Sequence, residues 1–187
     1  MLGRIAVHLD LDRGCRRRVR AAAQLAAEHD AALVGIHASF GRPLPYLYEG
    51  FFVSDDVNRM LRQRVDDDRT ATEALLQEVA GETGVTAHWR SGDGLAEDIL
   101  CEQARYCDLL VMSQPDDADP GPQQMPVLLA AVMLGAGRPV LMLPSVGELN
   151  AIGRRVLFCW DERRESARAL ADAGPILEEA SELFALR

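Results

Sequence analysis

The sequence predicts an α/β protein with a doubly wound, five-stranded parallel sheet that carries helices on both faces, as in a Rossmann-like fold. Two observations lead to this fold class. Short, continuously apolar runs, expected of strands buried on both faces, alternate with segments whose apolar residues recur at helical spacing. This alternation implies parallel strands joined by right-handed crossovers. At 187 residues the chain can hold one such domain and a smaller unit.

Each element follows from its own local pattern. The first apolar run ends at Asp10, which places a carboxylate at the carboxyl end of strand one. The second helix begins at Ser54 as its N-cap, with acidic residues in its first turn. A turn with the sequence SGDG, at 91–94, follows strand three. The expected strands are 4–10, 32–38, 85–90, 109–113 and 139–143, and the expected helices are 13–28, 54–81, 95–105 and 127–134.

Several features of this pattern have more than one interpretation. One face of the first helix carries Arg13, Arg16, Arg17 and Arg20, which form either a solvated surface or a site that attracts an anion. The long aromatic connection 39–52 either covers the core or acts as a lid or partner surface. His8 and His37 end neighbouring strands and either meet in the cleft or are core histidines. The three aspartates at 66–68 splay around their helix, so we expect no metal site.

The composition argues against several classes of partner. The formal net charge of −9 disfavours binding to nucleic acid or to an anionic membrane, because both partners attract a basic surface. No apolar run approaches the ~18 residues of a membrane span, and no secretory signal is visible at the N-terminus. We therefore expect a cytoplasmic protein.

Residues 154–187 repeat the N-terminal pattern after a polar link. An offset of 151 residues places Asp161 on Asp10, and it places 184–187 on 33–36. We therefore expect a complete domain at 1–146 and, at 154–187, the strand, helix and partial strand that start a second, incomplete copy. Because its strands need cover on both faces, this unit is expected to pack on the first domain or on another copy of the chain, unless it is poorly ordered.

Together these residues resemble the universal stress protein family in its tandem-domain bacterial form. The resemblance is carried by HLD at the end of strand one, HxA at the end of strand two, the segment GDGLAEDILCEQARYCDLLVMS and the closing RPVLMLP. It implies a sheet of strand order 3-2-1-4-5. It also implies a homodimer, or an intramolecular pair of domains, formed through the fifth strand.

Family members that bind nucleotides hold ATP with the Asp that ends strand one and with a GxxGx9G[ST] loop after strand four. The resemblance assigns the nucleotide side to Asp10, Ala38 and Met112, and to Asp161 in the second copy.

The phosphate loop that the resemblance implies is degenerate in this chain. Its three glycines fall on Ser113, Asp116 and Pro126, and its hydroxyl residue falls on Val127. Proline supplies no N–H donor, valine supplies no hydroxyl, and aspartates in the loop repel a triphosphate. We therefore expect no cofactor, and ATP is disfavoured.

The expected function is that of a noncatalytic stress-response protein that acts as a scaffold, dimerisation or sensing module. Its partner would be an unidentified protein or small molecule. The alternative is an ATP-binding, slowly hydrolysing switch of the same family, which Asp10 and Asp161 favour. An ATP pyrophosphatase of the related α-hydrolase group needs an SGGxDS-like loop after strand one, where this chain has HLDLDRGC.

Overall fold

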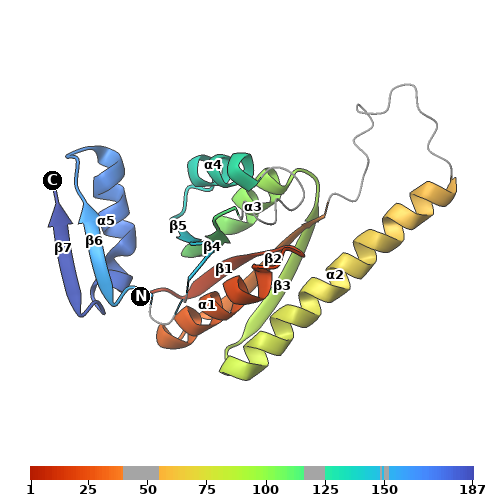
Figure 1. Ribbon diagram of the computed structural model, residues 1–187, viewed down its shortest axis with the longest axis horizontal. Helices are drawn as coiled ribbons and strands as arrows, with labels where there is room; N and C mark the ends of the chain where they lie inside the picture. The colour runs from red at the N-terminus through yellow and green to blue at the C-terminus, as the bar shows by residue number, and fades with distance from the viewer. Residues whose placement is uncertain (40–54, 116–124, 148, 150–151) are drawn as a thin grey trace.

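The protein is described from a computed structural model that covers residues 1–39, 55–115, 125–147, 149 and 152–187 (Figure 1). Its main sheet has five parallel strands in the order β3-β2-β1-β4-β5. The strands are β1 (Arg4–Leu9), β2 (Ala32–Ser39), β3 (Ala87–Asp93), β4 (Leu109–Ser113) and β5 (Val140–Leu143). The predicted fold class and strand order are confirmed.

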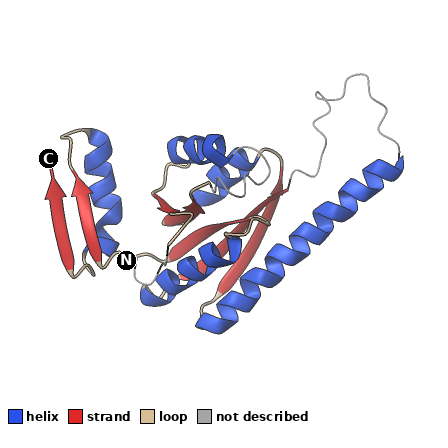
Figure 2. Ribbon diagram, in the orientation of Figure 1, coloured by secondary structure: helices blue, strands red, loops and turns tan. Residues whose placement is uncertain are grey.

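Helices cover both faces of this sheet (Figure 2). The four helices are α1 (Cys15–Glu28), α2 (Asp55–Thr83), α3 (Ala96–Ala104) and α4 (Met125–Gly135). Alternate residues of β1 point to opposite faces. Ile5, Val7 and Leu9 pack with residues of α1 and α2, whereas Ala6 packs with residues of α3 and α4. Among the described helices, none combines the length and apolar character that crossing a membrane requires.

Strand β3 is longer than the sequence predicts. The turn expected at 91–94 is wrong, because β3 stays paired with β2 as far as Ser39 and Asp93. Position 92 requires glycine, because a Cβ there would lie 2.6 Å from the Ile99 side chain of α3 and would clash with it. The aromatic connection beyond Ser39 and the predicted N-cap at Ser54 lie outside the described residues.

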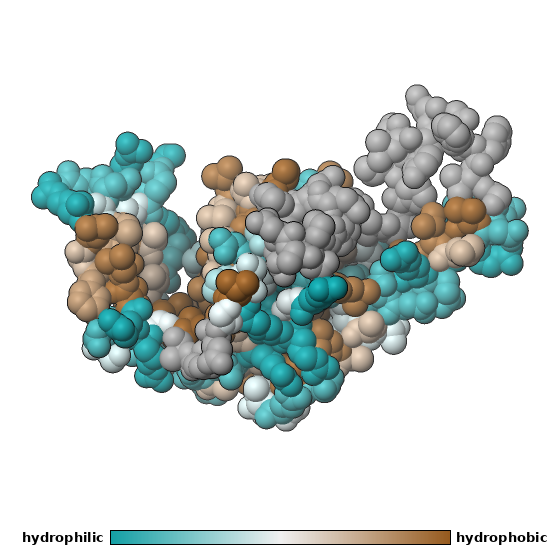
Figure 3. Space-filling view, viewed as in Figure 1, coloured by the Kyte–Doolittle hydropathy of each residue, from teal (hydrophilic) through white to brown (hydrophobic). Residues whose placement is uncertain are grey.

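The first half of α2 extends beyond the sheet (Figure 1). A helix of 29 residues spans about 44 Å, whereas a strand of seven or eight residues spans about 25 Å. The buried residues of α2 accordingly begin at Thr72. The apolar side chains of Val57, Met60 and Leu61, which the sequence assigns to the apolar line of this helix, are exposed near its start (Figure 3).

The C-terminal residues form a separate two-stranded parallel sheet from β6 (Arg155–Cys159) and β7 (Glu182–Leu186), joined by α5 (Arg164–Leu177). The strand–helix–strand order is that of β1, α1 and β2, but the predicted constant offset is wrong at β7. Ile5 pairs with Leu33 in the first sheet, and Val156 pairs with Leu183 in the second. Strand β7 therefore matches β2 at an offset of 150, because paired residues are 27 positions apart in the second sheet and 28 positions apart in the first.

Candidate functional site

The carboxyl edge of the sheet gathers the residues that the resemblance assigns to a nucleotide. Asp10 directly follows β1, and Met112 and Ser113 end the neighbouring β4. Ala38 lies in β2, on the other side of β1. Open α/β sheets bind ligands at this edge. The Met112 side chain is buried in the core beneath α3 and α4, so it does not line the edge.

A fully buried arginine, Arg18 of α1, occupies this edge between β1 and β4. Its Nε donates to the carbonyl oxygen of His8 at 2.8 Å. One terminal nitrogen donates to Asp10 Oδ1 at 2.6 Å, and the other donates to Ser113 Oγ at 2.9 Å and to Asp12 Oδ2 at 3.3 Å. The guanidinium thus links the ends of both strands and already pairs with the carboxylate expected to meet a nucleotide.

The helical position of Arg18 explains its burial. It lies three residues after Cys15 and four before Ala22, within the buried stripe that α1 packs against the sheet. A long side chain from this stripe can reach the strand ends beyond the apolar core. Arg18 does not belong to the face formed by Arg13, Arg16, Arg17 and Arg20, and helical spacing alone gives it no functional role. The signal that marks it is a charged residue in an otherwise apolar stripe.

Electrostatics hold the cluster in its charged form. Burial raises the pKa of Asp10, but the Arg18 cation, with help from His8 and hydrogen bonds, outweighs burial and lowers it to about 2. Burial raises the pKa of Asp12, and Arg18 opposes that rise only in part. Near neutral pH, Arg18 and Asp10 therefore form an ion pair whose side chains are 0% and 22% exposed.

The two histidines are on opposite faces of the sheet and do not meet. His8 shares its face with Ala6, and its Nδ1 lies 3.5 Å from Asp10 Oδ2. Burial lowers the pKa of His8 to about 4, although Asp10 acts in the opposite direction. His37 lies beside Leu9, whose carbonyl oxygen is 3.2 Å from its Nδ1, and stacks on Trp89 at 6.5 Å. Both are core histidines, which is one of the two interpretations that the sequence left open.

A second arginine bridges the ends of β2 and β3 with hydrogen bonds. Arg69 of α2 donates from Nε to Ser39 Oγ at 3.1 Å and from Nη2 to Asp93 Oδ1 at 2.6 Å. Its side chain is 29% exposed. Arg18 of α1 therefore bridges the ends of β1 and β4, and Arg69 of α2 bridges those of β2 and β3. Both helices cover the same face of the sheet.

The structure describes the side-chain environment of two of the four degenerate loop positions, Ser113 and Val127. Ser113 is buried at the end of β4 and bound to Arg18, whereas Val127 is exposed in the first turn of α4. Pro126 also lies in that first turn. Proline lacks a backbone N–H, but the first N–H groups of a helix make no intrahelical hydrogen bond, so its lack does not weaken α4. Asp116 lies outside the described residues.

The second copy of the strand-end aspartate has a different environment. Asp161 Oδ1 accepts a hydrogen bond from the Arg163 backbone N–H at 3.1 Å, as Asp10 Oδ1 does from Asp12 at 3.2 Å. The local turn is therefore repeated. The side chain of Asp161, however, is 57% exposed, and the guanidinium of Arg163, 3.7 Å away, belongs to an exposed side chain.

The arginine face of α1 makes internal contacts. Arg16 makes two hydrogen bonds to Glu78 of α2, at 2.9 and 2.6 Å, and Arg20 contacts Glu82 one turn further on. Arg17 donates to four successive backbone carbonyls that follow β5, those of residues 144–147, at 2.6–3.4 Å. These contacts join α1 to α2 and to the link with the second unit.

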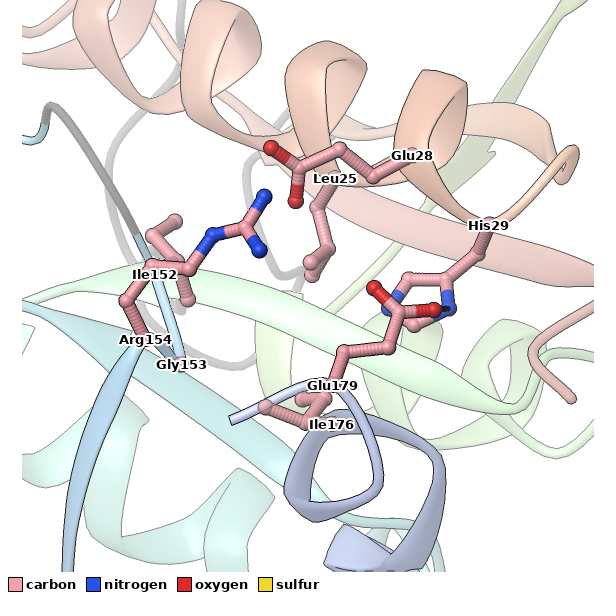
Figure 4. Close-up of a pocket in the computed structure, with 8 residues that line it drawn as sticks. All are labelled: Leu25, Glu28, His29, Ile152, Gly153, Arg154, Ile176 and Glu179. Carbon is pink, nitrogen blue, oxygen red and sulfur yellow. Dashed lines mark ion pairs between the residues drawn. The ribbon is translucent and has the colours of Figure 1, made fainter. Parts of the chain in front are cut away.

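The second unit contacts the C-terminal end of α1 (Figure 4). A narrow crevice there is lined by apolar side chains from both units, including Leu25 and Ile176. At its edge His29 Nδ1 lies 3.3 Å from Glu179 Oε1. Residues 154–187 therefore pack on the first domain along one side of α5.

Replacing Arg17 with methionine will release the link. Losing the hydrogen bonds to four carbonyls is expected to lower the free energy of unfolding by only about 1 kcal/mol, because the group is largely solvated. Cleavage between 144 and 153 by a protease specific for large apolar residues should accelerate severalfold. Arg20→Met, which removes an exposed contact to Glu82, is the matched control. Equal cleavage rates for both variants would contradict a role for Arg17 in holding the link.

The polar side chains at this edge are hydrogen-bonded to one another. The Ser113 hydroxyl accepts a hydrogen bond from Arg18, and a guanidinium cannot take a proton from it. Burial raises the pKa of the Cys15 thiol to about 11, so this thiol is protonated at neutral pH. Within the described part of the chain, no three His, Cys, Asp or Glu side chains are grouped as metal ligands.

Comparisons with known proteins identify the fold. No protein-family model matches the sequence. No curated protein sequence matches it significantly. A universal stress protein in complex with cAMP is 20% identical at a TM-score of 0.54, over 78% of this chain and 98% of that one. A universal stress protein family member from Burkholderia pseudomallei is 22% identical at a TM-score of 0.55, over 76% of this chain and 96% of that one. The universal stress protein UspA from Lactobacillus plantarum is 16% identical at a TM-score of 0.57, over 75% of this chain and 97% of that one. The chain therefore adopts the universal stress protein fold.

Proposed function

We propose that the chain is a noncatalytic universal stress protein of the tandem-domain type. It would act in the stress response as a scaffold, dimerisation or sensing module. The single observation that supports this function best is the burial of Arg18 against Asp10, Asp12 and Ser113. The carboxylate that a nucleotide would meet is paired from within, and the phosphate loop lacks its glycines.

The geometry argues against a nucleotide at this edge. A ligand that took the place of Arg18 at Asp10 Oδ1 would have to displace a hydrogen-bonded guanidinium that is 0% exposed. Breaking a buried ion pair by removing one partner costs about 3–5 kcal/mol. Arg69 imposes a similar requirement at the ends of β2 and β3. A dimer through the fifth strand is compatible with this closed edge, because β5 pairs with β4 on one side only among the described strands.

The second candidate is a nucleotide-binding switch. One neighbour with this fold is in complex with cAMP. In this chain the second-copy Asp161 is exposed, so no displacement of a buried cation is needed there.

Titration of the full chain with ATP and Mg²⁺ separates the two candidates. We expect no binding heat and no change in thermal stability at about 1 mM ATP. A ligand present at 100 times its dissociation constant would instead stabilise the protein by about 2.7 kcal/mol. CTP is the control for nonspecific attraction of a triphosphate to arginines. Micromolar binding of ATP in preference to CTP would overturn the scaffold proposal.

A further inference from the structure

The arginine face of α1 lines a groove on the surface of the first domain. The face consists of one residue in the turn before α1 and three in its first two turns, namely Arg13, Arg16, Arg17 and Arg20. The groove has a volume of about 380 Å³, and its other walls are Ala21, Gln24 and Leu149. Small-ligand sites in proteins typically have volumes of about 300–1,000 Å³. The second unit contacts the opposite, C-terminal end of α1, so the groove is separate from that contact.

The internal contacts of this face show which chemical groups it binds. Arg16 holds the Glu78 carboxylate through two hydrogen bonds, at 2.9 and 2.6 Å, in the bidentate manner typical of arginine and carboxylate. Arg17 donates to four successive backbone carbonyls of the link, at 144–147. Carboxylates and backbone carbonyls are the two kinds of acceptor that an acidic peptide offers. The arginine face therefore already binds both groups within the chain.

The arginine face also provides positive charge at an accessible position. The carbonyl partners of Arg17 are neutral, so its guanidinium keeps its full charge. The side chains of Arg16 and Arg20 are 44% and 52% exposed, although each contacts a glutamate. The chain as a whole carries a net charge of −9, but charges more than about 10 Å away are largely screened at 0.1 M ionic strength. An acidic segment in the groove therefore interacts mainly with the nearby arginines.

We propose that the arginine face of α1 is a docking surface for an extended acidic segment of a partner protein. This inference rests on the proposed scaffold function, and it specifies the chemistry of the partner. The seven positions from Arg13 to Arg20 cover about 10 Å at helical rise, and an extended chain advances about 3.3 Å per residue. A segment of about four residues thus spans the whole face. Charges spread along a row suit several separate carboxylates better than one compact anion.

Peptide binding to the full chain tests this surface. The probe is a fluorescein-labelled hexaglutamate peptide, followed by fluorescence anisotropy at about 0.1 M salt, with hexaglutamine as the uncharged control peptide. The native chain should bind hexaglutamate and not hexaglutamine. Arg13→Gln combined with Arg17→Gln should weaken the binding at least fivefold. Arg62→Gln combined with Arg64→Gln removes the same charge from an exposed part of α2, and it should change the affinity less than twofold.

A second pair of variants should bind more tightly, which a misfolded chain would not do. Glu78→Gln combined with Glu82→Gln removes the carboxylates that compete for Arg16 and Arg20, so the affinity for hexaglutamate should rise at least threefold. Asp98→Asn combined with Glu102→Gln makes the same change of net charge on exposed positions of α3, and it should give no comparable gain.

Three results would overturn the proposal. They are no binding of hexaglutamate to the native chain, equal effects of a variant pair and its control pair, and tighter binding of inorganic tripolyphosphate than of hexaglutamate. The last result would assign the groove to phosphate anions. The groove lies outside the carboxyl edge of the sheet, so micromolar binding of ATP would overturn the scaffold function, whereas failure of the peptide to bind would overturn only this docking surface.

Discussion

Replacing Arg18 with methionine will lower the free energy of unfolding by about 3–5 kcal/mol at neutral pH. The side chain is fully buried, and its loss would leave Asp10 and Asp12 without their cation at the end of β1. Methionine preserves much of the volume, so the loss reports on charge and hydrogen bonding and not on a cavity. Urea unfolding followed by tryptophan fluorescence, to which Trp89 of β3 contributes, measures the change.

The matched control is Arg20→Met on the same helix. Arg20 contacts Glu82 through side chains that are 52% and 44% exposed, so its loss should cost less than about 1 kcal/mol. A chain that combines Arg18→Met with Asp10→Asn and Asp12→Asn should recover part of the stability, because no uncompensated charge remains. If Arg18→Met and Arg20→Met cost the same, the buried network has no special role.

The strands buried on both faces are the elements that the sequence predicts best. The continuous apolar runs of β1 and β4 leave no ambiguity, and their observed bounds lie close to the predicted ones. Strand β3 is half exposed at the edge of the sheet, and its last residues, SGD, are typical of a turn. Only the pairing with β2 makes them strand, so local sequence could not predict its end.

The candidate site is predictable in position but not in content. Asp10 follows from a carboxylate at the end of an apolar run, and the structure places it at the expected edge. Arg18 was missed because arginine is rarely buried unless it is paired, and its partners depend on the sheet order. Arg69 has no comparable local signal, since it contacts residues 24 and 30 positions away.

The repeat shows a similar limit. Composition and spacing predict a second strand–helix–strand unit, but a constant offset cannot detect the one-residue difference in how β7 pairs with β6. A shift of one residue reverses which side chains face the helix. The observed register pairs Phe184 with Leu157, so Phe184 corresponds to Val34 and not to Leu33.

Replacing His8 with glutamine will reduce the pH dependence of stability between about pH 7 and pH 4. Burial lowers the pKa of His8 from 6.5 in the unfolded chain to about 4. A lowered folded-state pKa means that the unfolded chain binds the proton first, so stability is complete above about pH 6.5 and falls as the pH approaches 4. The loss attributable to His8 is about 3 kcal/mol.

Urea unfolding at half-unit pH steps measures this loss as the difference in slope between the native chain and His8→Gln. Burial also lowers the pKa of His37, which acts in the same direction in both chains and cancels in the difference. Asp10 contributes in a lower window, because its stabilising charge is lost only as the pH falls from about 4 to about 2. His88→Gln, at an exposed position of β3, is the control and should keep the native slope. Parallel curves for the native chain and His8→Gln would show that His8 is protonated without strain beside Asp10, and the cluster would then be open to solvent.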